Sequence, residues 1–145
     1  MRVVLQRVSR ATVDVDGAVV GAIGRGLLAL VGVGHTSTEG DARWLAHKTA
    51  ALRVFGDADG RMNLSVGDIA GAVLVVSQFT LYGDVARGRR PSFVAAAAPG
   101  RARELYEMYC STLPTAVERG VFGAHMTINA AADGPVTLLL EREGS

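Results

Sequence analysis

The chain has 145 residues, a length that suits one domain with a hydrophobic core, and we expect a single domain over residues 1–145. Its formal net charge of +1 excludes binding of a polyanion through bulk charge alone. Nearly half of the residues (49%) are hydrophobic, more than a compact monomer of this size can cover, so we predict a homodimer.

The first third of the chain predicts an antiparallel sheet. Asp16-Gly17 is a strong hairpin signal between two β-rich runs. Residues 26–34 form a continuous apolar run closed by glycines, which is typical of a central strand. The β-rich runs before it are residues 2–8, 10–15 and 18–23.

The middle of the chain changes to a helical period. Apolar residues on one face predict a helix over residues 38–52, with Thr38 or Asp41 as its N-cap. Residues 55–63 are rich in Asp and Gly and predict a loop, and they lack the glutamate that completes an EF-hand calcium site. Residues 72–81 predict the next buried strand.

The last third predicts a second helix over about 99–113. Pro99 suits an early helical position, and Pro114 ends the helix. Many strands, two helices and hairpin connections predict an α+β fold, a largely antiparallel sheet or barrel with about two helices. The two final strands are predicted at about 125–131 and 136–141.

The sequence also limits the chemistry. Cys110 is the single cysteine, which excludes an internal disulfide and a cysteine-rich metal site, and a buried inert thiol is favoured there. His35, His47 and His125 lack metal-ligand spacing, and a structural role is favoured for His125. We predict no metal and no cofactor. A signal peptide and a membrane-spanning stretch are both missing, so we expect a cytoplasmic protein with no membrane partner.

The segment VLVVSQFTLYGD, residues 73–84, begins as a buried strand and then places polar side chains where a core strand would continue. Ser77, Gln78 and Thr80 interrupt the apolar run. Ser77 does not stand in the G-x-S-x-G turn of a hydrolase nucleophile. Either these hydroxyls bond neighbouring backbone, or the segment serves an enzyme that works largely without a strong general base.

The chain resembles the D-aminoacyl-tRNA deacylase family over almost its whole length. Its segments SQFTL (77–81) and GPVT (134–137) match the two signature motifs of that family. Ala132 departs from the pattern, because family members usually carry asparagine there, and we expect altered support of the loop without loss of activity. The other matching segments are MRVVLQRVSRATVDVDG, IGRGLLALVGVG, WLAHKTAALRVFGDADGRMNLSV and GRRPSF, in the order and spacing of the family.

The resemblance implies an enzyme that hydrolyses the ester bond of D-aminoacyl-tRNA and releases the D-amino acid and the tRNA. Gly134 and Pro135 are implied to form a cis peptide that enters the active site of the neighbouring subunit in a homodimer. Their carbonyls would accept hydrogen bonds from the α-ammonium group of the substrate. An L-residue would strike this backbone and a D-residue would not, and glycyl-tRNA is expected to be a second substrate because glycine has no side chain.

The implied catalytic residues are Ser77, Gln78, Phe79 and Thr80. Main-chain N–H groups around Gln78 and Phe79 are expected to hold the ester carbonyl and its developing oxyanion, while the Ser77 and Gln78 side chains organise the pocket. Two groups are candidates to assist the attacking water or nucleophile, the 2′-hydroxyl of the tRNA and the hydroxyl of Thr80. The tRNA route is favoured, because no base is evident to activate Thr80.

Arg87, Arg89 and Arg90 gather in one short segment. Such a segment is by default a solvated loop, but beside a tRNA substrate it predicts phosphate contacts near the acceptor end that are independent of sequence. The competing hypothesis is a non-catalytic RNA-binding barrel module with this loop as its binding surface. The pair of motifs favours the enzyme, because a binding module would not need both.

Overall fold

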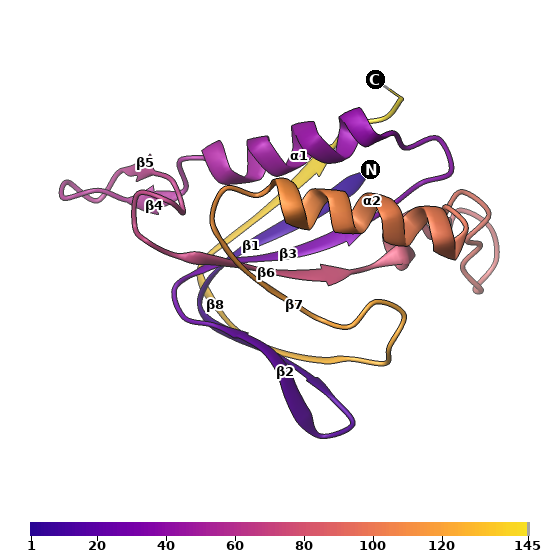
Figure 1. Ribbon diagram of the computed structural model, residues 1–145, viewed down its shortest axis with the longest axis horizontal. Helices are drawn as coiled ribbons and strands as arrows, with labels where there is room; N and C mark the ends of the chain where they lie inside the picture. The colour runs from indigo at the N-terminus through magenta and orange to yellow at the C-terminus, as the bar shows by residue number, and fades with distance from the viewer. Residues whose placement is uncertain (145) are drawn as a thin grey trace.

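The computed structural model describes residues 1–144 of the chain. Within these residues, a six-stranded mixed sheet carries two α-helices on one face (Figure 1). β3 pairs with residues 2–8 of β1 and β2 with residues 11–15, while β8 pairs with residues 2–14 of β1; β6 and β7 follow β3 in the sheet. The strands are β1 (Arg2–Val15), β2 (Ala18–Ile23), β3 (Gly26–Gly32), β6 (Ala72–Ser77), β7 (Ala116–Arg119) and β8 (Thr127–Glu141), and the helices are α1 (Glu39–Ala51) and α2 (Pro99–Thr112).

This architecture confirms the predicted α+β fold and adds parallel pairing to it. β1 runs antiparallel to β2, β3 and β8, as the hairpin signals suggested. The pairs β3–β6 and β6–β7 are parallel. Parallel neighbours need a crossover connection, and α1 and α2 lie in the two crossovers. Both helices lie on the same face of the sheet (Figure 1), and the Gly144 N–H after β8 donates to the Asp41 carboxylate of α1 (2.9 Å).

Several predicted strand limits were wrong. Residues 2–15 form one strand instead of two, and residues 127–141 likewise form one strand. The strand predicted over 72–81 ends at Ser77, because a 3₁₀ helix, η1 (Phe79–Tyr82), follows it. The predicted loop 55–63 contains most of a small hairpin, β4 (Phe55–Gly56) with β5 (Met62–Leu64).

Both helices lie close to their predicted limits. The two candidate N-caps of α1 act together, because the Thr38 hydroxyl accepts from the Asp41 N–H (3.2 Å) and the Asp41 carboxylate accepts from the Thr38 N–H (2.9 Å). Pro99 opens α2, and Pro114 follows its C-cap. No helix within residues 1–144 is long and apolar enough to cross a membrane.

The main core lies between the helices and the sheet. Tyr106 and Tyr109 of α2 are its largest buried side chains, and the Tyr109 hydroxyl bonds Thr49 of α1 (2.8 Å). Cys110 is 2% exposed, as the apolar stripe predicted. Burial raises the pKa of this thiol to about 11, so it is protonated and inert at neutral pH.

Candidate functional site

The site begins where β6 ends. Ser77 is the last residue of this strand and pairs with Val31 of β3, and the Gln78 N–H then donates to the Val31 carbonyl (2.8 Å). The chain next turns into η1, which packs on bare backbone. A Cβ at Gly32 would lie 2.9 Å from Cβ of Leu81, so only glycine permits this close approach. The glycine-rich end of β3 thus fixes where η1 can lie.

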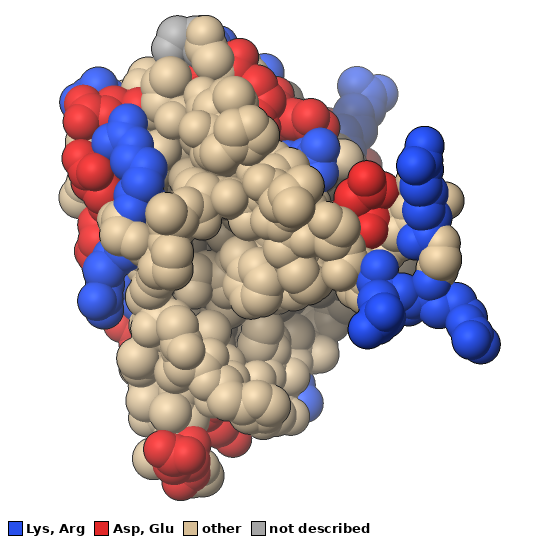
Figure 2. Space-filling view, turned by 90° about the vertical axis from the view of Figure 1, so that its right-hand side faces the viewer, with Lys and Arg blue, Asp and Glu red and all other residues tan. Residues whose placement is uncertain are grey.

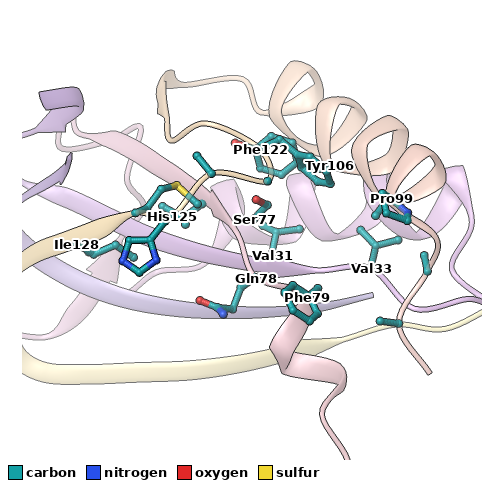
Figure 3. Close-up of a pocket in the computed structure, with 17 residues that line it drawn as sticks. Val31, Val33, Ser77, Gln78, Phe79, Pro99, Tyr106, Phe122, His125 and Ile128 are labelled. Carbon is teal, nitrogen blue, oxygen red and sulfur yellow. The ribbon is translucent and has the colours of Figure 1, made fainter. Parts of the chain in front are cut away.

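A cavity of about 500 Å³ opens beside this turn, between the sheet and the start of α2 (Figure 3). Ser77, Gln78 and Phe79 line one part of it, and the other walls are mainly apolar, with Phe122 and His125 among them. No Asp or Glu lines the cavity within residues 1–144. The lining therefore offers main-chain dipoles and apolar surface, which suits binding and orientation better than acid–base chemistry.

The four predicted catalytic residues lie together, with different surroundings. Ser77, Gln78 and Phe79 line the cavity, whereas Thr80 does not, and the Gln78 amide donates to the Thr80 hydroxyl. Phe79 is 57% exposed and packs edge-on against Phe93, with ring centroids 5.0 Å apart. The tyrosine of the cavity wall, Tyr106, is turned to the Val75 carbonyl (3.2 Å), and burial raises the pKa of its hydroxyl, which therefore stays protonated.

His125 is the imidazole of this cavity, although its sequence position favoured a structural role. It stands just before β8 and is exposed, in a wall that also contains Met126 and Ile128 (Figure 3). The sequence indicated that His125 lies near the start of a strand. No sequence pattern indicated that the start of β8 would lie next to the end of β6.

Gly134 and Pro135 lie outside this cavity, and their peptide bond is cis, as the resemblance implied. Gln6 of β1 pairs with Thr137 and Val8 pairs with Ala132, so one residue of β1 faces residues 133–136 of β8. The extra residues form an exposed bend in the middle of the strand. Ala132, the departure from the family pattern, is at its edge and still pairs in the sheet.

Arg7, the residue opposite the bend, holds it in place. Its Nε donates to the Asp133 carbonyl (3.2 Å) and forms an ion pair with the Asp133 carboxylate, also at 3.2 Å. Its Nη1 donates to the Val54 carbonyl (2.7 Å), next to β4. A Cβ at Gly134 would lie 2.9 Å from Nη2 of Arg7, so glycine lets the guanidinium sit under the bend. The motifs gave no hint of this residue.

The predicted basic segment follows η1. Arg87, Arg89 and Arg90 are exposed in a loop whose ends are joined by the bridge between Asp84 and Ser92. Within residues 1–144, none of the three arginines forms an ion pair. Figure 2 shows Lys and Arg side chains clustered at one edge of a face whose centre is hollowed and uncharged.

A metal centre is not evident. No group of three or more His, Cys, Asp or Glu side chains that could hold an ion occurs among residues 1–144. The three histidines lie in separate places, in the turn after β3, on α1 and before β8.

Comparison with known proteins places the chain in a family. The family described as D-Tyr-tRNA(Tyr) deacylase matches residues 4–141. A D-aminoacyl-tRNA deacylase of Anaeromyxobacter dehalogenans is 58% identical, and one of Thermotoga petrophila is 57% identical, each covering 97% of this chain and 97% of that protein. A solved structure, the c-Myc DNA Unwinding Element Binding Protein, is 38% identical with a TM-score of 0.92, covering 98% of this chain and 99% of that one. The chain therefore belongs to the D-Tyr-tRNA(Tyr) deacylase family.

Proposed function

We propose that the chain hydrolyses the ester bond of D-aminoacyl-tRNA, and of mischarged glycyl-tRNA, to release the amino acid and the tRNA in the cytoplasm without a cofactor. The observation that carries this proposal is the match, over 97% of the chain and at 58% identity, to a protein named D-aminoacyl-tRNA deacylase. The cavity beside Ser77, Gln78 and Phe79 supports it, because the two signature motifs lie on surfaces open to a substrate.

The Phe79 N–H is the main-chain donor that we assign to the ester carbonyl. The Gln78 N–H already donates to the Val31 carbonyl, so it is not free to hold an oxyanion. Phe79 begins η1, and the first N–H groups of a helix have no partner inside it. An aimed N–H of this kind lowers the barrier of acyl transfer by roughly 2.7–4 kcal/mol. The Ser77 and Gln78 side chains organise the pocket around it.

Chirality is read by Gly134 and Pro135 of a second subunit. These residues are exposed and do not line the cavity of their own chain, so one subunit alone has an incomplete site. The main-chain carbonyls of the bend hold the substrate ammonium, and the same backbone blocks the side chain of an L-residue. Glycine has no side chain to block and passes.

An uncovered apolar face of the sheet supports the dimer. Leu139 of β8 is 62% exposed, and it pairs with Val4 of β1 on the side of the sheet away from the helices. Beside it, a shallow hollow is lined by Val4 and by Leu81 of η1. A second copy that covers this face would bring one subunit's β8 next to the other subunit's η1.

The apolar cavity and the arginine loop suit binding of the acceptor end of the tRNA. The terminal adenosine enters the apolar cavity, and Arg87, Arg89 and Arg90 contact phosphates near the acceptor end. The Thr80 hydroxyl accepts a hydrogen bond from the Gln78 amide. The 2′-hydroxyl of the tRNA therefore remains the favoured group to position or activate the attacking water.

The test compares D-tyrosyl-tRNA with L-tyrosyl-tRNA, each with and without a chelator. We expect rapid hydrolysis of the D-ester, survival of the L-ester at its uncatalysed rate, and no effect of the chelator. Equal slow decay of both esters contradicts stereospecific deacylation, and loss of activity with the chelator contradicts a reaction that needs no metal.

A nucleic-acid-binding module remains the second hypothesis, because a protein of the same fold carries a name that refers to DNA binding. The same assay separates the two functions. Tight binding of tRNA with no hydrolysis of the D-ester would favour the module.

A further inference from the structure

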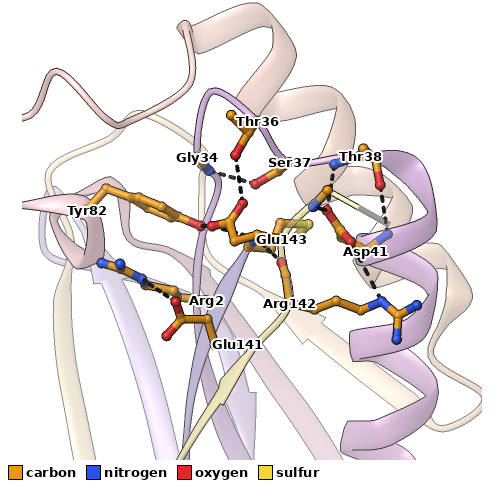
Figure 4. A network of polar contacts seen from close by, with 12 residues as sticks. Arg2, Gly34, Thr36, Ser37, Thr38, Asp41, Tyr82, Glu141, Arg142 and Glu143 are labelled. Atoms are coloured by element: carbon orange, nitrogen blue, oxygen red, sulfur yellow. Dashed lines mark hydrogen bonds and ion pairs between the residues drawn. The ribbon is translucent and has the colours of Figure 1, made fainter.

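Tyr82, the last residue of η1, is anchored outside the cavity. Its side chain is 6% exposed, and its hydroxyl donates a hydrogen bond to the Glu143 carboxylate (Figure 4). Gly34 makes room for the ring, because a Cβ at that position would lie 2.6 Å from Cε1 of Tyr82. The Tyr82 ring is therefore held in one position, between the backbone after β3 and the segment that follows β8.

Glu143 is held by other parts of the chain. Its carboxylate accepts from the Thr36 hydroxyl (3.0 Å) and lies 3.2 Å from the Met1 ammonium. The same ammonium donates to the Arg142 carbonyl (2.5 Å). The acceptor of the Tyr82 hydroxyl is therefore fixed by groups from both the loop before α1 and the start of β1 (Figure 4).

Arg2 reaches η1 from the same side. Its Nη1 donates to the Leu81 carbonyl (2.8 Å), and its guanidinium lies over the Tyr82 ring, 4.5 Å from the centroid. An ion pair with Glu141 (3.6 Å) holds this guanidinium. One end of η1 is thus anchored in a polar network, and the other end places Phe79 at the cavity.

We infer that Tyr82 and Glu143 are positioning residues of the proposed deacylation, which fix η1 so that the Phe79 N–H points at the ester. This inference rests on the proposed function, because the aim of that N–H matters only if it binds the ester carbonyl. A short 3₁₀ helix has poor internal hydrogen bonding; here Leu81 N–H donates to Gln78 (3.2 Å) and Gly83 N–H donates to Thr80 (2.9 Å). Its placement therefore depends on side-chain anchors.

The kinetic test compares Tyr82→Phe with Tyr109→Phe. The control removes another buried tyrosine hydroxyl, from a core site where it bonds Thr49. Tyr82→Phe is expected to lower kcat for D-tyrosyl-tRNA about tenfold and to change KM less than about twofold, because the cavity that binds the adenosine is intact. Tyr109→Phe should leave both within about twofold of the wild type. Glu143→Gln should follow Tyr82→Phe. Glu39→Gln, at a half-buried carboxylate of α1 that pairs with Arg43, should follow the wild type.

Amide hydrogen exchange provides a readout that needs no activity. The Leu81 and Gly83 amides should exchange about tenfold faster in Tyr82→Phe and Glu143→Gln, and at the wild-type rate in both controls. Should wild-type protein leave the D-ester intact, the proposed function fails and exchange alone decides whether the anchor holds η1. Unchanged exchange overturns the inference. So does faster exchange with a wild-type kcat, or an equal fall of kcat in both Tyr→Phe variants.

Discussion

Arg7 acts at the scale of a single side chain. Its side chain is 14% exposed, and it joins two segments, the bend at Asp133 and the carbonyl of Val54. Its partners lie 126 and 47 residues away in the sequence, so no local pattern could indicate its role. Once the register of β1 and β8 is known, its place opposite the bend follows directly.

Replacing Arg7 with alanine should loosen the bend and leave the Val54 carbonyl without a donor. We expect kcat/KM for D-tyrosyl-tRNA to fall about ten- to a hundredfold, because the bend positions the substrate ammonium. Unfolding should become easier by about 1–3 kcal/mol. Single-turnover kinetics and urea unfolding measure the two effects, with the exposed Arg10→Ala as control. Wild-type kinetics in Arg7→Ala would contradict a role for the bend.

The basic loop, which carries Arg87, Arg89 and Arg90, is distinguished by its exposed positive charge. Arg87, Arg89 and Arg90 pack into no core, so their replacement should spare the fold. Changing all three to glutamine should raise KM while kcat stays near the wild-type value, because phosphate contacts position the substrate without touching the ester. For single-stranded RNA, each lost contact should also reduce the slope of log affinity against log salt by about 0.7.

Binding of deacylated tRNA at several salt concentrations measures this slope. Arg43→Gln with Arg101→Gln is a suitable control, because both arginines are exposed and paired on helices. An unchanged slope in the triple variant would remove the loop from the tRNA interface.

At the scale of elements, the sequence predicts helices better than strand ends. The apolar periods of both helices, the capping box of α1 and the prolines at the ends of α2 are local signals, and both helices formed where expected. β7 escaped prediction because Ala116–Arg119 alternates over only four residues and includes two charges. η1 escaped because Phe79–Tyr82 is rich in residues that favour strands, and the turn is imposed by its packing on Gly32.

The candidate site divides in the same way. Ser77, Gln78 and Phe79 were predicted from a motif, and the structure brings them to one cavity. Thr80 does not line that cavity, and His125 does. Neither placement could be predicted from the neighbouring residues in the sequence. Which main-chain donor is free depends on the pairing of β6 with β3, a property of the whole sheet.

At the scale of the molecule, the dimer can be tested through one exposed leucine. Leu139→Lys places a charge on the uncovered sheet face and should give a monomer in sedimentation experiments. Deacylation of the D-ester should fall about a hundredfold with it, because each site then lacks the partner's bend. Val19→Lys is the matched control, since Val19 is 60% exposed on β2, and it should remain dimeric. A fully active Leu139→Lys monomer would contradict the shared site.

The stability of the whole protein should fall in alkali. Burial raises the pKa of Cys110 to about 11, from an ordinary value of 9.0, and burial also raises the pKa values of Tyr106 and Tyr109. These groups are neutral in the folded state, so their contribution is complete below pH 9 and is lost as the pH rises through the folded pKa values. Urea unfolding between pH 8 and 11 should show this loss. Cys110→Ala should flatten the part of the curve between about pH 9 and 11, and an identical slope would contradict the assignment.

The pairing of β1 with β8 has a consequence for biosynthesis. Arg2 lies opposite Glu141, so β1 is translated long before the strand that covers this edge of it. During translation, β1 can form a hairpin with β2 and pair with β3. The edge of β1 that pairs with β8 stays unpaired and exposed to water until β8 has been translated. Chaperones that shield unpaired strand edges would therefore find their target in the nascent chain.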